Sequence, residues 1–560
     1  MEKVWLKSYP PGVPETLNLD TYPSINEAMA VYFEQHAQKT AFINFGVSIT
    51  YQDLNNLTRQ FAAFLQQQLQ LKKNDRFAIV LPNVLQFPIA MFGALRAGLT
   101  VTNVNPLYTA HELAFQLKDS GATAVIVLEN FAHELSLALP KTDIQHVIIA
   151  KMGDCLGWFK GPVANGIVKW IKRLIPAYQL PEKINLVYFK KAVKIGKCLQ
   201  LEKVAIASDD VAFLQYTGGT TGVPKGAMLT HHNIVANVTQ CVAWVKSSLK
   251  MGQETVLTAL PLYHIFSLTV CCFCFMSLGS RCLLITNPRD LTGFIRTLRK
   301  VPVTIFVGVN TLFNGLLNHP RFSALKFSTM KLVIAGGMAL QQSIADEWQK
   351  RSGTVIVEGY GLTEASPVVS INPLNITRFN GSIGLPVPET CVAIRDDAGN
   401  NLPVGKPGEL CVRGPQVMRG YWHNPAETNL VLDKDNWLRT GDIAQMDERG
   451  FIYILDRKKD MIIVSGFNVY PNEVEEVIAS HPRVREVAVV GAPSEKSGEM
   501  VKAYIVKKLE NVGTSPLTAK DIIAYCRERL TAYKIPKQIE FCTQLPKSAV
   551  GKVLRRALRT

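Results

Sequence analysis

Short runs of apolar, strand-forming residues recur along the first two thirds of this chain, and helical patterns lie between them. Nearly every position in each run is apolar, which is typical of strands that are covered on both faces of a sheet. One helical stretch, Thr50–Gln68, opens with a capping pattern. Strands that alternate with helices predict an α/β fold with largely parallel sheets. The strand-like runs are Arg76–Leu81, Ala122–Leu128, Val211–Tyr216, Thr304–Gly308 and Lys331–Ala335.

The pattern changes after about Pro386, where short strands and Gly/Pro turns replace the long alternation. Gly408–Gly414 and Gly450–Leu455 are examples, and the last section, Tyr470–Thr560, mixes helices with strands. At 560 residues the chain is too long for one ordinary domain. Its composition, 47% hydrophobic and 19% charged, is that of a folded protein. We expect a large N-terminal domain at residues 1–455, with stacked, mostly parallel sheets and a small β-rich subdomain, and a small α+β domain at residues 457–560.

No segment of the sequence predicts a membrane span or a secretion signal. Thr255–Ser280 carries no charged residue, but Pro261 and His264 interrupt it, so a buried strand followed by a buried helix explains it better. Met1–Pro14 contains prolines where a signal peptide has its apolar core. The 11 cysteines follow no repeated spacing, and several lie in apolar runs, which favours buried thiols in a reducing compartment. We expect a cytoplasmic protein.

Positive charge is concentrated in two regions. Residues 151–203 contain 11 Lys/Arg against 3 Asp/Glu, and residues 457–560 contain 19 against 11, while the rest of the chain is neutral. Two basic regions on a neutral body suggest two anionic partners, anionic lipid and a phosphate-rich cofactor. We find no zinc-finger, RRM or basic-zipper pattern, so nucleic acid is not an expected partner.

The basic segment 151–203 also carries aromatic and aliphatic residues, among them Trp158, Phe159 and Trp170. Within it, Gly166–Ile175 could form a short amphipathic helix. Lys and Arg that meet headgroups and Trp that meets the interface suit an element lying on a membrane surface, at the inner face of the cell membrane. A solvated basic loop on an insertion has the same composition, and the sequence does not separate the two readings.

A glycine-rich segment, Tyr216–Gly226, follows an apolar strand directly. Its glycines let backbone N–H groups approach an anion, its threonine hydroxyls add donors, and Lys225 adds charge. It is not a P-loop, because Gly226 follows the lysine and no helix is expected to begin there. The segment therefore predicts a polyphosphate site rather than a structural turn. Its candidate ligands are Thr217, Gly218, Gly219, Thr220, Thr221, Gly222 and Lys225.

This segment resembles the phosphate-binding signature of the AMP-forming acyl-CoA synthetases, the adenylate-forming superfamily. Further signatures follow in the family's order, so that the resemblance spans Tyr216 to Lys552. Three of them, Trp437–Asp442, Asp456–Asp460 and Ser465–Pro471, are most similar to bacterial long-chain fatty-acid–CoA ligases.

Several nucleotide-binding candidates lie around the expected strand Val355–Glu358. The sequence Gly359-Tyr360-Gly361-Leu362-Thr363-Glu364 would lie past the carboxyl end of that strand, where open α/β sheets bind ligands. Tyr360 offers a ring face to a purine, Thr363 a hydroxyl to a phosphate, and Glu364 an oxygen ligand to Mg²⁺. An ordinary surface carboxylate is the alternative for Glu364. The resemblance adds Glu358, Gly359 and Gly361 to the nucleotide site, and Thr217 beside Glu364 as a metal ligand.

Other candidates lie far apart in the sequence. By resemblance, Gly336 and Gly337 lie against the adenine ring, and Ile454 belongs to the same site. Asp442 can accept both ribose hydroxyls, and Arg457 could donate to the same sugar. His264 lies in an apolar run, where a lone histidine is more often core. In the family, the equivalent region resembles a gate near the substrate carboxylate. Ile265–Leu278 and Val307–Leu317 could line an alkyl tunnel or be simple core.

The resemblance implies a two-step ligase with ATP, Mg²⁺ and coenzyme A. A fatty carboxylate attacks the α-phosphate to give acyl-AMP and pyrophosphate, and the thiol of coenzyme A then displaces AMP. Lys552 follows a glycine and would meet the developing charge, with Thr217, Glu364 and His264 as the other catalytic candidates. The mobile C-terminal domain would rotate about Asp456 between the steps and present Ser465, Gly466 and Phe467 to coenzyme A.

Two alternatives share parts of this pattern. A fatty-acyl-AMP ligase that loads a carrier protein would have the same ATP motifs, and a non-enzymatic lipid-binding protein would explain residues 151–203 alone. Acyl chain length, oligomeric state and the pathway supplied do not follow from the sequence.

Overall fold

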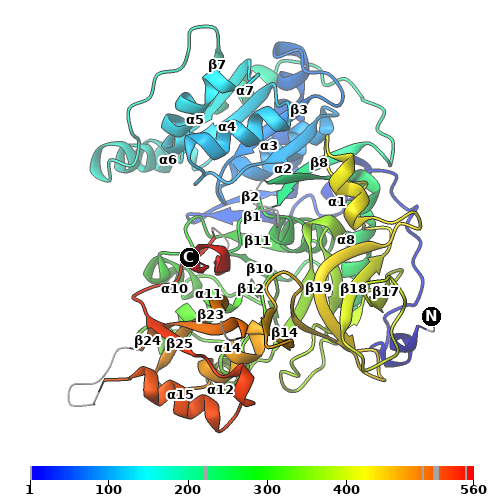
Figure 1. Ribbon diagram of the computed structural model, residues 1–560. Helices are drawn as coiled ribbons and strands as arrows, with labels where there is room; N and C mark the ends of the chain where they lie inside the picture. Colours follow the sequence, from blue (N-terminus) through cyan, green and yellow to red (C-terminus); the bar gives the residue numbers. More distant parts are fainter. Residues whose placement is uncertain (1–2, 218–223, 495–496, 509–515, 549–550, 560) are drawn as a thin grey trace.

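The computed structural model describes residues 3–217, 224–494, 497–508, 516–548 and 551–559 (Figure 1). Its N-terminal part contains two large sheets, which confirms the α/β class. The first has the strand order β7-β6-β5-β3-β4-β8-β9. All its neighbouring strands are parallel except the last pair, β8 and β9. These strands are β3 (Arg76–Val80), β4 (Thr100–Asn103), β5 (Ala124–Leu128), β6 (His146–Ala150), β7 (Asn185–Tyr188), β8 (Val211–Thr217) and β9 (Lys225–Thr230).

The second sheet has nine strands in the order β16-β15-β14-β13-β12-β10-β11-β1-β2. Its middle strands, from β14 to β1, are parallel, and antiparallel strands close both edges. The strands are β1 (Thr40–Asn44), β2 (Val47–Thr50), β10 (Thr255–Thr258), β11 (Arg281–Leu284), β12 (Ile305–Gly308), β13 (Leu332–Ala335), β14 (Ile356–Gly361), β15 (Val368–Ile371) and β16 (Leu385–Pro386).

Helices pack the two sheets against each other around a shared core. Helix α3 is buried from Gln86 to Leu95, and its Phe92 ring meets Phe273 of the other layer edge-on at 5.6 Å. The predicted capping box is confirmed at the start of α2, where Thr50 and Asp53 satisfy each other's backbone N–H groups. The helices of this part are α1 (Ile25–Gln35), α2 (Tyr51–Ala63), α3 (Gln86–Arg96), α4 (Ala110–Asp119), α5 (Ala132–Ala138), α6 (Gly157–Gly166), α7 (Phe189–Gly196), α8 (His231–Val245), α9 (Phe275–Ser277), α10 (Leu291–Leu298), α11 (Asn310–Leu317) and α12 (Gln342–Ser352).

The charge-free stretch Thr255–Ser280 forms strand β10 and then a buried helical segment, Ser267–Cys274, which α9 continues. This confirms the expected buried strand and helix. Cys271, Cys272 and Cys274 are buried there. Within the described part of the chain, no helix is both long and apolar enough to cross a membrane.

A four-stranded antiparallel sheet follows, with the order β17-β18-β19-β20. Its elements are β17 (Cys391–Arg395), β18 (Gly408–Arg413), β19 (Leu438–Met446), β20 (Ile452–Arg457) and helix α13 (Pro425–Val431). The predicted short strands and turns are present here: Asp447–Phe451 forms a turn, and the strand that follows it pairs with β19 as far as Arg457.

The C-terminal part has a core of its own. Strands β22, β21, β24 and β23 are antiparallel in that order, and β25 pairs parallel with β24. Helix α15 begins after a Thr518 cap and ends at Arg527. The elements are β21 (Ile462–Val464), β22 (Phe467–Val469), α14 (Pro471–Ala479), β23 (Val484–Ser494), β24 (Gly498–Lys507), α15 (Ala519–Arg527) and β25 (Gln538–Phe541).

Candidate functional site

The two ends of the glycine-rich segment lie side by side. Thr217 ends β8 and Lys225 begins β9, and the two residues are partners in the antiparallel ladder. As expected, the lysine begins a strand and no helix. The Lys225 ammonium ion-pairs with Glu427 of α13 and lies 5.4 Å from the centre of the Tyr421 ring. The candidate ligands Gly218, Gly219, Thr220, Thr221 and Gly222 lie outside the described residues.

Tyr421 joins the glycine-rich hairpin to Glu364. Its hydroxyl donates to Glu364 Oε1 at 2.8 Å, while its backbone forms a bridge with Ala227 of β9. Glu364 lies in the single turn Thr363–Ala365 that follows β14, and its carbonyl oxygen accepts from Met418 N at 2.7 Å. The Glu364 side chain is only partly buried. The β8–β9 strand pair, which contains Thr217, is therefore connected through Tyr421 to Glu364, the other predicted metal ligand.

The predicted ribose ligands also come together. Asp442 and Arg457 are cross-strand partners on β19 and β20, and Arg457 Nε lies 3.6 Å from Asp442 Oδ1. The Tyr360 hydroxyl donates to Asp442 Oδ2 at 2.5 Å, and burial raises the pKa of Tyr360 above its ordinary value. Ile454 lies on the same strand as Arg457. One correction concerns Gly359, Tyr360 and Gly361, which form the last residues of β14 and do not follow the strand.

The glycines of the adenine candidate region are required by close packing. A Cβ on Gly336 would lie 3.0 Å from the Phe266 ring and 3.1 Å from Gly359 O, and Gly337 has a φ of +77°. Glu358 is buried and accepts from Leu340 N at 3.1 Å, which ties this loop to β14. Burial raises the pKa of Glu358 to about 8, so the carboxyl is mostly protonated at neutral pH.

Lys552 reaches this site from the C-terminal part. Burial, and then the charge of Arg457, lower its pKa to about 7, while Asp442 opposes that shift. The pKa of His264 is lowered to about 4 by burial and by the charge of Lys552, which places the lysine within electrostatic reach of this histidine as well. Both side chains are partly exposed. The structure thus brings together residues that are almost 300 positions apart in the chain.

A short turn holds Lys552 in place. Ser548 N donates to Lys552 O at 2.7 Å, and Lys552 N donates back to Ser548 Oγ at 3.1 Å. Gly551 has a φ of +83°, and a Cβ on it would lie 2.5 Å from Thr311 Oγ1 of α11. Glycine is therefore the residue that allows this turn to approach the N-terminal part.

Asp456, the predicted pivot, is fully buried at the end of β20. It accepts from Asn472 N at 2.7 Å and from Arg555 Nη1 at 2.9 Å, and Arg555 also pairs with Glu475 at 2.8 Å. No sequence motif singled out Arg555. Tyr421 was missed as well, because a single aromatic residue in a loop carries no periodic signal.

Ser465, Gly466 and Phe467 do not join the cluster around Lys552. Ser465 and Gly466 form the tight turn between β21 and β22, with φ values of +51° and +83°. Phe467 is exposed and stacks on Tyr533 of the same domain at 4.9 Å. The two candidate tunnel stretches, Ile265–Leu278 and Val307–Leu317, contribute mostly to the core that the large sheets share.

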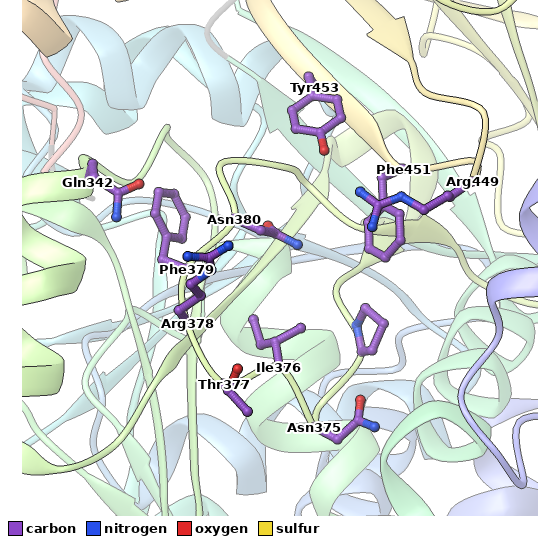
Figure 2. A pocket seen from close by; sticks show the side chains of 11 residues that line it. Gln342, Asn375, Ile376, Thr377, Arg378, Phe379, Asn380, Arg449, Phe451 and Tyr453 are labelled. Atoms are coloured by element: carbon purple, nitrogen blue, oxygen red, sulfur yellow. The ribbon is translucent and has the colours of Figure 1, made fainter.

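None of the predicted site residues that the structure describes lines a solvent-open cavity of about 720 Å³ (Figure 2). Its walls come from the loop after β15 and from the β19–β20 turn, with Arg378, Asn380, Arg449 and Tyr453 among the polar lining residues.

Comparison with known proteins decides the family. Residues 29–422 match the AMP-binding enzyme family, and residues 473–552 match the AMP-binding enzyme C-terminal domain. The chain belongs to the AMP-binding enzyme family. This confirms the resemblance to AMP-forming acyl-CoA synthetases, most like the bacterial long-chain type. The region of this AMP-binding enzyme that matches the first family contains every candidate site residue from Thr217 to Gly361, and the region that matches the C-terminal domain contains Lys552.

Relatives match the AMP-binding enzyme along its whole length. A long-chain-fatty-acid–CoA ligase of Escherichia coli is 53% identical, over 100% of this chain and 98% of that protein. A ligase of the same name from Bacillus subtilis is 39% identical over the same shares. The solved structure of the anthranilate CoA ligase AuaEII with anthranoyl-AMP has a TM-score of 0.84 and 24% identity, covering 97% of this chain and 98% of that one. At that identity it supports the fold alone.

Proposed function

We propose that this protein is a long-chain fatty-acid–CoA ligase that works through an acyl-AMP intermediate. The observation that carries the proposal is the position of Lys552, which lies within electrostatic reach of Asp442, Arg457 and His264 although it belongs to the other domain. Proteins named long-chain-fatty-acid–CoA ligases are 53% and 47% identical to this chain along its whole length, which supports long-chain fatty acids as the substrate class.

In the first half-reaction, a carboxylate oxygen of the fatty acid bonds to the α-phosphorus of ATP, and pyrophosphate leaves with the electron pair of the broken P–O bond. In the second, the sulfur of coenzyme A bonds to the acyl carbon, AMP leaves with the electron pair of the C–O bond, and the thiol proton passes to solvent. No step needs a protein nucleophile. Positioning and charge neutralisation are what this chain must supply.

The described residues fit these roles. Tyr360 offers a ring face to the purine, and Asp442 accepts hydroxyl hydrogen bonds from the ribose. Lys552 donates to the α-phosphate and to the attacking carboxylate. Its pKa of about 7 leaves it partly protonated in the free protein at neutral pH. The negative charge of bound ATP raises that pKa and favours the cation.

Mg²⁺ fits the oxygen donors at this site. No group of three or more His, Cys, Asp or Glu side chains in the described residues could hold a metal without help. One carboxylate and one hydroxyl, from Glu364 and Thr217, match the way Mg²⁺ binds when substrate phosphates and water complete its shell. When bound, the ion neutralises charge on the phosphates. Tyr421 orients Glu364 by donating to Oε1, which leaves Oε2 for the metal.

The test follows the products. Purified protein with ATP, Mg²⁺, palmitate and coenzyme A, and with no carrier protein, should release free palmitoyl-CoA. A carrier-loading ligase would accumulate acyl-AMP under these conditions and make thioester only after a carrier is added. A lipid-binding protein without activity would not exchange pyrophosphate into ATP.

We further propose that helix α6 and the helical turn Ile167–Ile171 dock the ligase on an anionic membrane at the cytoplasmic face. The described residues of α6 bury only Gly161. Trp158, Trp170 and Ile171 expose 88%, 73% and 75% of their surface, which is unusual for large apolar side chains. The helix extends from the edge of the molecule (Figure 1). It begins nine residues before the expected Gly166 start, so the apolar surface is larger than the sequence predicted.

Charge and neighbouring structure support the same surface. Lys169 lies 5.1 Å from the Trp170 ring centre, and Lys160 donates to Gly46 O at 3.4 Å. That contact places the β1–β2 turn, with its exposed Phe45, beside α6. Apolar rings with lysines among them suit the interface of an anionic bilayer, where each cation contributes about 1 kcal/mol.

Flotation with vesicles tests the membrane proposal. The protein should bind vesicles rich in anionic lipid at low salt and bind less as salt rises, since the attraction is screened. Replacing both Trp158 and Trp170 with Ala should weaken binding, whereas Leu430→Ala, at another exposed apolar position, which lies on α13, should not. Equal binding to neutral vesicles would refute the electrostatic account, and absence of any effect of the two tryptophan substitutions would favour the solvated-loop interpretation.

A further inference from the structure

The C-terminal domain contacts helix α11 and the amino-terminal turn of helix α12 of the N-terminal part (Figure 1). Glu476 of α14 accepts a hydrogen bond from Gln342 N at 3.0 Å, and Asn314 Nδ2 of α11 donates to Arg485 O at 3.1 Å. The turn that carries Lys552 meets the same surface, because Gly551 lies against Thr311. These contacts and the position of Lys552 therefore belong to one arrangement of the domains.

Helix α12 has no capping side chain of its own. The residue before it, Gln341, makes no capping hydrogen bond, and Gln342 is the first helical residue. The first N–H groups of a helix lack partners within the helix, and an anion at that end is favourable. Glu476 supplies the missing acceptor from the other domain.

The Gln341 side chain is engaged elsewhere. Gln341 N donates to Asn310 Oδ1 at 3.1 Å, and Asn310 Nδ2 donates to Gln341 Oε1 at 3.3 Å. This reciprocal pair ties the start of α12 to the start of α11. The surface that receives the C-terminal domain is thus fixed within the N-terminal part before the domain docks.

Opposing influences act on the Glu476 carboxylate where it meets Gln342 N. Burial raises the pKa of Glu476, the hydrogen bond from Gln342 N lowers it, and the like charges of Asp346 and Glu475 raise it again. A carboxylate with one backbone donor and two acidic neighbours can orient a domain and still release it. This suits a domain that must leave after each adenylation.

We propose that Glu476 is a positioning residue for the adenylation half-reaction, which holds the C-terminal domain on α12 so that Lys552 reaches the α-phosphate. The inference rests on the proposed two-step function. Glu476 touches no reacting atom, so its loss lowers the fraction of molecules that present Lys552. The second half-reaction, in which the family's domain takes another position, does not use this contact.

Two variants remove the contact from opposite sides. Glu476→Ala removes the acceptor, and Gln342→Pro removes the donor, since proline lacks an N–H. Proline is favoured at the first position of a helix, and Gln341 has a ψ of 135°, which suits a residue before proline. Controls are Gln342→Ala, which keeps the N–H, and Glu473→Ala, which removes an acid of α14 whose partner is Lys534 in its own domain.

Each half-reaction is measured separately. Pyrophosphate exchange into ATP should fall about tenfold in Glu476→Ala and in Gln342→Pro, the effect of one hydrogen bond to a charged group. Conversion of supplied acyl-AMP and coenzyme A should stay near wild type in both. The double variant should be no worse than either single one, because both remove the same bond. Both controls should behave like wild type.

Three results would overturn the inference. Equal loss in both half-reactions would make Glu476 structural, as would a lowered melting temperature that accounts for the exchange defect. Additive effects in the double variant would mean that the two residues act separately. The proposed function fails in a different way, because the wild-type protein itself would then show either no exchange or acyl-AMP that coenzyme A does not discharge.

Discussion

Replacing Lys552 with Ala separates the two half-reactions more sharply than any other single change at this site. The lysine lies within electrostatic reach of Asp442, Arg457 and His264, where it can meet charge that develops at the α-phosphate. Removing a preorganised donor to such a charge costs about 2.7–4 kcal/mol of transition-state stabilisation, or ~10²–10³ in rate. We expect pyrophosphate exchange to fall by that factor.

The second half-reaction should remain. Thioester formation from supplied acyl-AMP and coenzyme A does not require charge neutralisation of a departing pyrophosphate. The Ala variant should carry out this step at near the wild-type rate. Equal damage to both halves would refute the reasoning, because it would mean that Lys552 holds structure and not charge.

Stability provides an independent control for the same variant. The pKa of Lys552 falls from its ordinary 10.5 to about 7 in the folded protein. Between pH 7 and pH 10.5 the unfolded chain binds more protons at this group than the folded protein does, so the wild-type protein becomes more stable as pH rises through this range. Below pH 7 the lysine is charged in both states, and the folded protein bears the full cost of burying the cation. Lys552→Ala should therefore raise the melting temperature of the ligand-free protein near pH 6, with a gain that shrinks towards pH 10.5. A lower melting temperature at pH 6 would mean that lost packing outweighs the relieved charge.

Three further changes test other parts of the site. Glu364→Gln should raise the Mg²⁺ concentration needed for half-maximal turnover while leaving the melting temperature nearly unchanged, and an unaltered magnesium titration would remove Glu364 from the metal site. Glu358→Gln should match wild type in thermal stability at pH 5 and exceed it at pH 9. Because the pKa of Glu358 is raised to about 8, the stability of the wild-type protein falls as pH rises from about 4.5 to about 8. The amide does not titrate, so the variant lacks this dependence on pH. If the melting temperatures of the two proteins changed in parallel across this range, the raised pKa of Glu358 would be contradicted. Gly466→Leu should slow thioester formation and spare adenylation, since a side chain with φ at +83° distorts the β21–β22 turn proposed to meet coenzyme A; loss of pyrophosphate exchange in this variant would count against that division.

Local signals predicted the class of fold, and the family resemblance supplied most of the candidate site. The apolar runs became the buried strands β3, β5, β8, β12 and β13, because a strand covered on both faces needs apolar residues throughout. Thr50 capped α2 as its neighbours indicated. Asp442 and Arg457, which the family resemblance assigned to one sugar, are cross-strand partners in the structure.

Contacts between distant segments could not be predicted in this way. Tyr421 orients Glu364, Arg555 pairs with Asp456, and Glu476 caps α12, yet none of these residues has a sequence pattern that names its partner. The boundary of β14 was missed for a related reason. Glycines 359 and 361 suggested a loop, but β15 pairs with this segment and extends the strand through it. Tertiary pairing overrides local preference there.

The central claim is that a carboxylate is activated by adenylation and then passed to a thiol. Product stoichiometry in one reaction with ATP, palmitate, coenzyme A and Mg²⁺ tests this claim most directly. One AMP and one pyrophosphate should form for each palmitoyl-CoA, and leaving out coenzyme A should leave enzyme-bound palmitoyl-AMP. Formation of ADP and phosphate, or of acyl-AMP that coenzyme A does not discharge, would contradict the account.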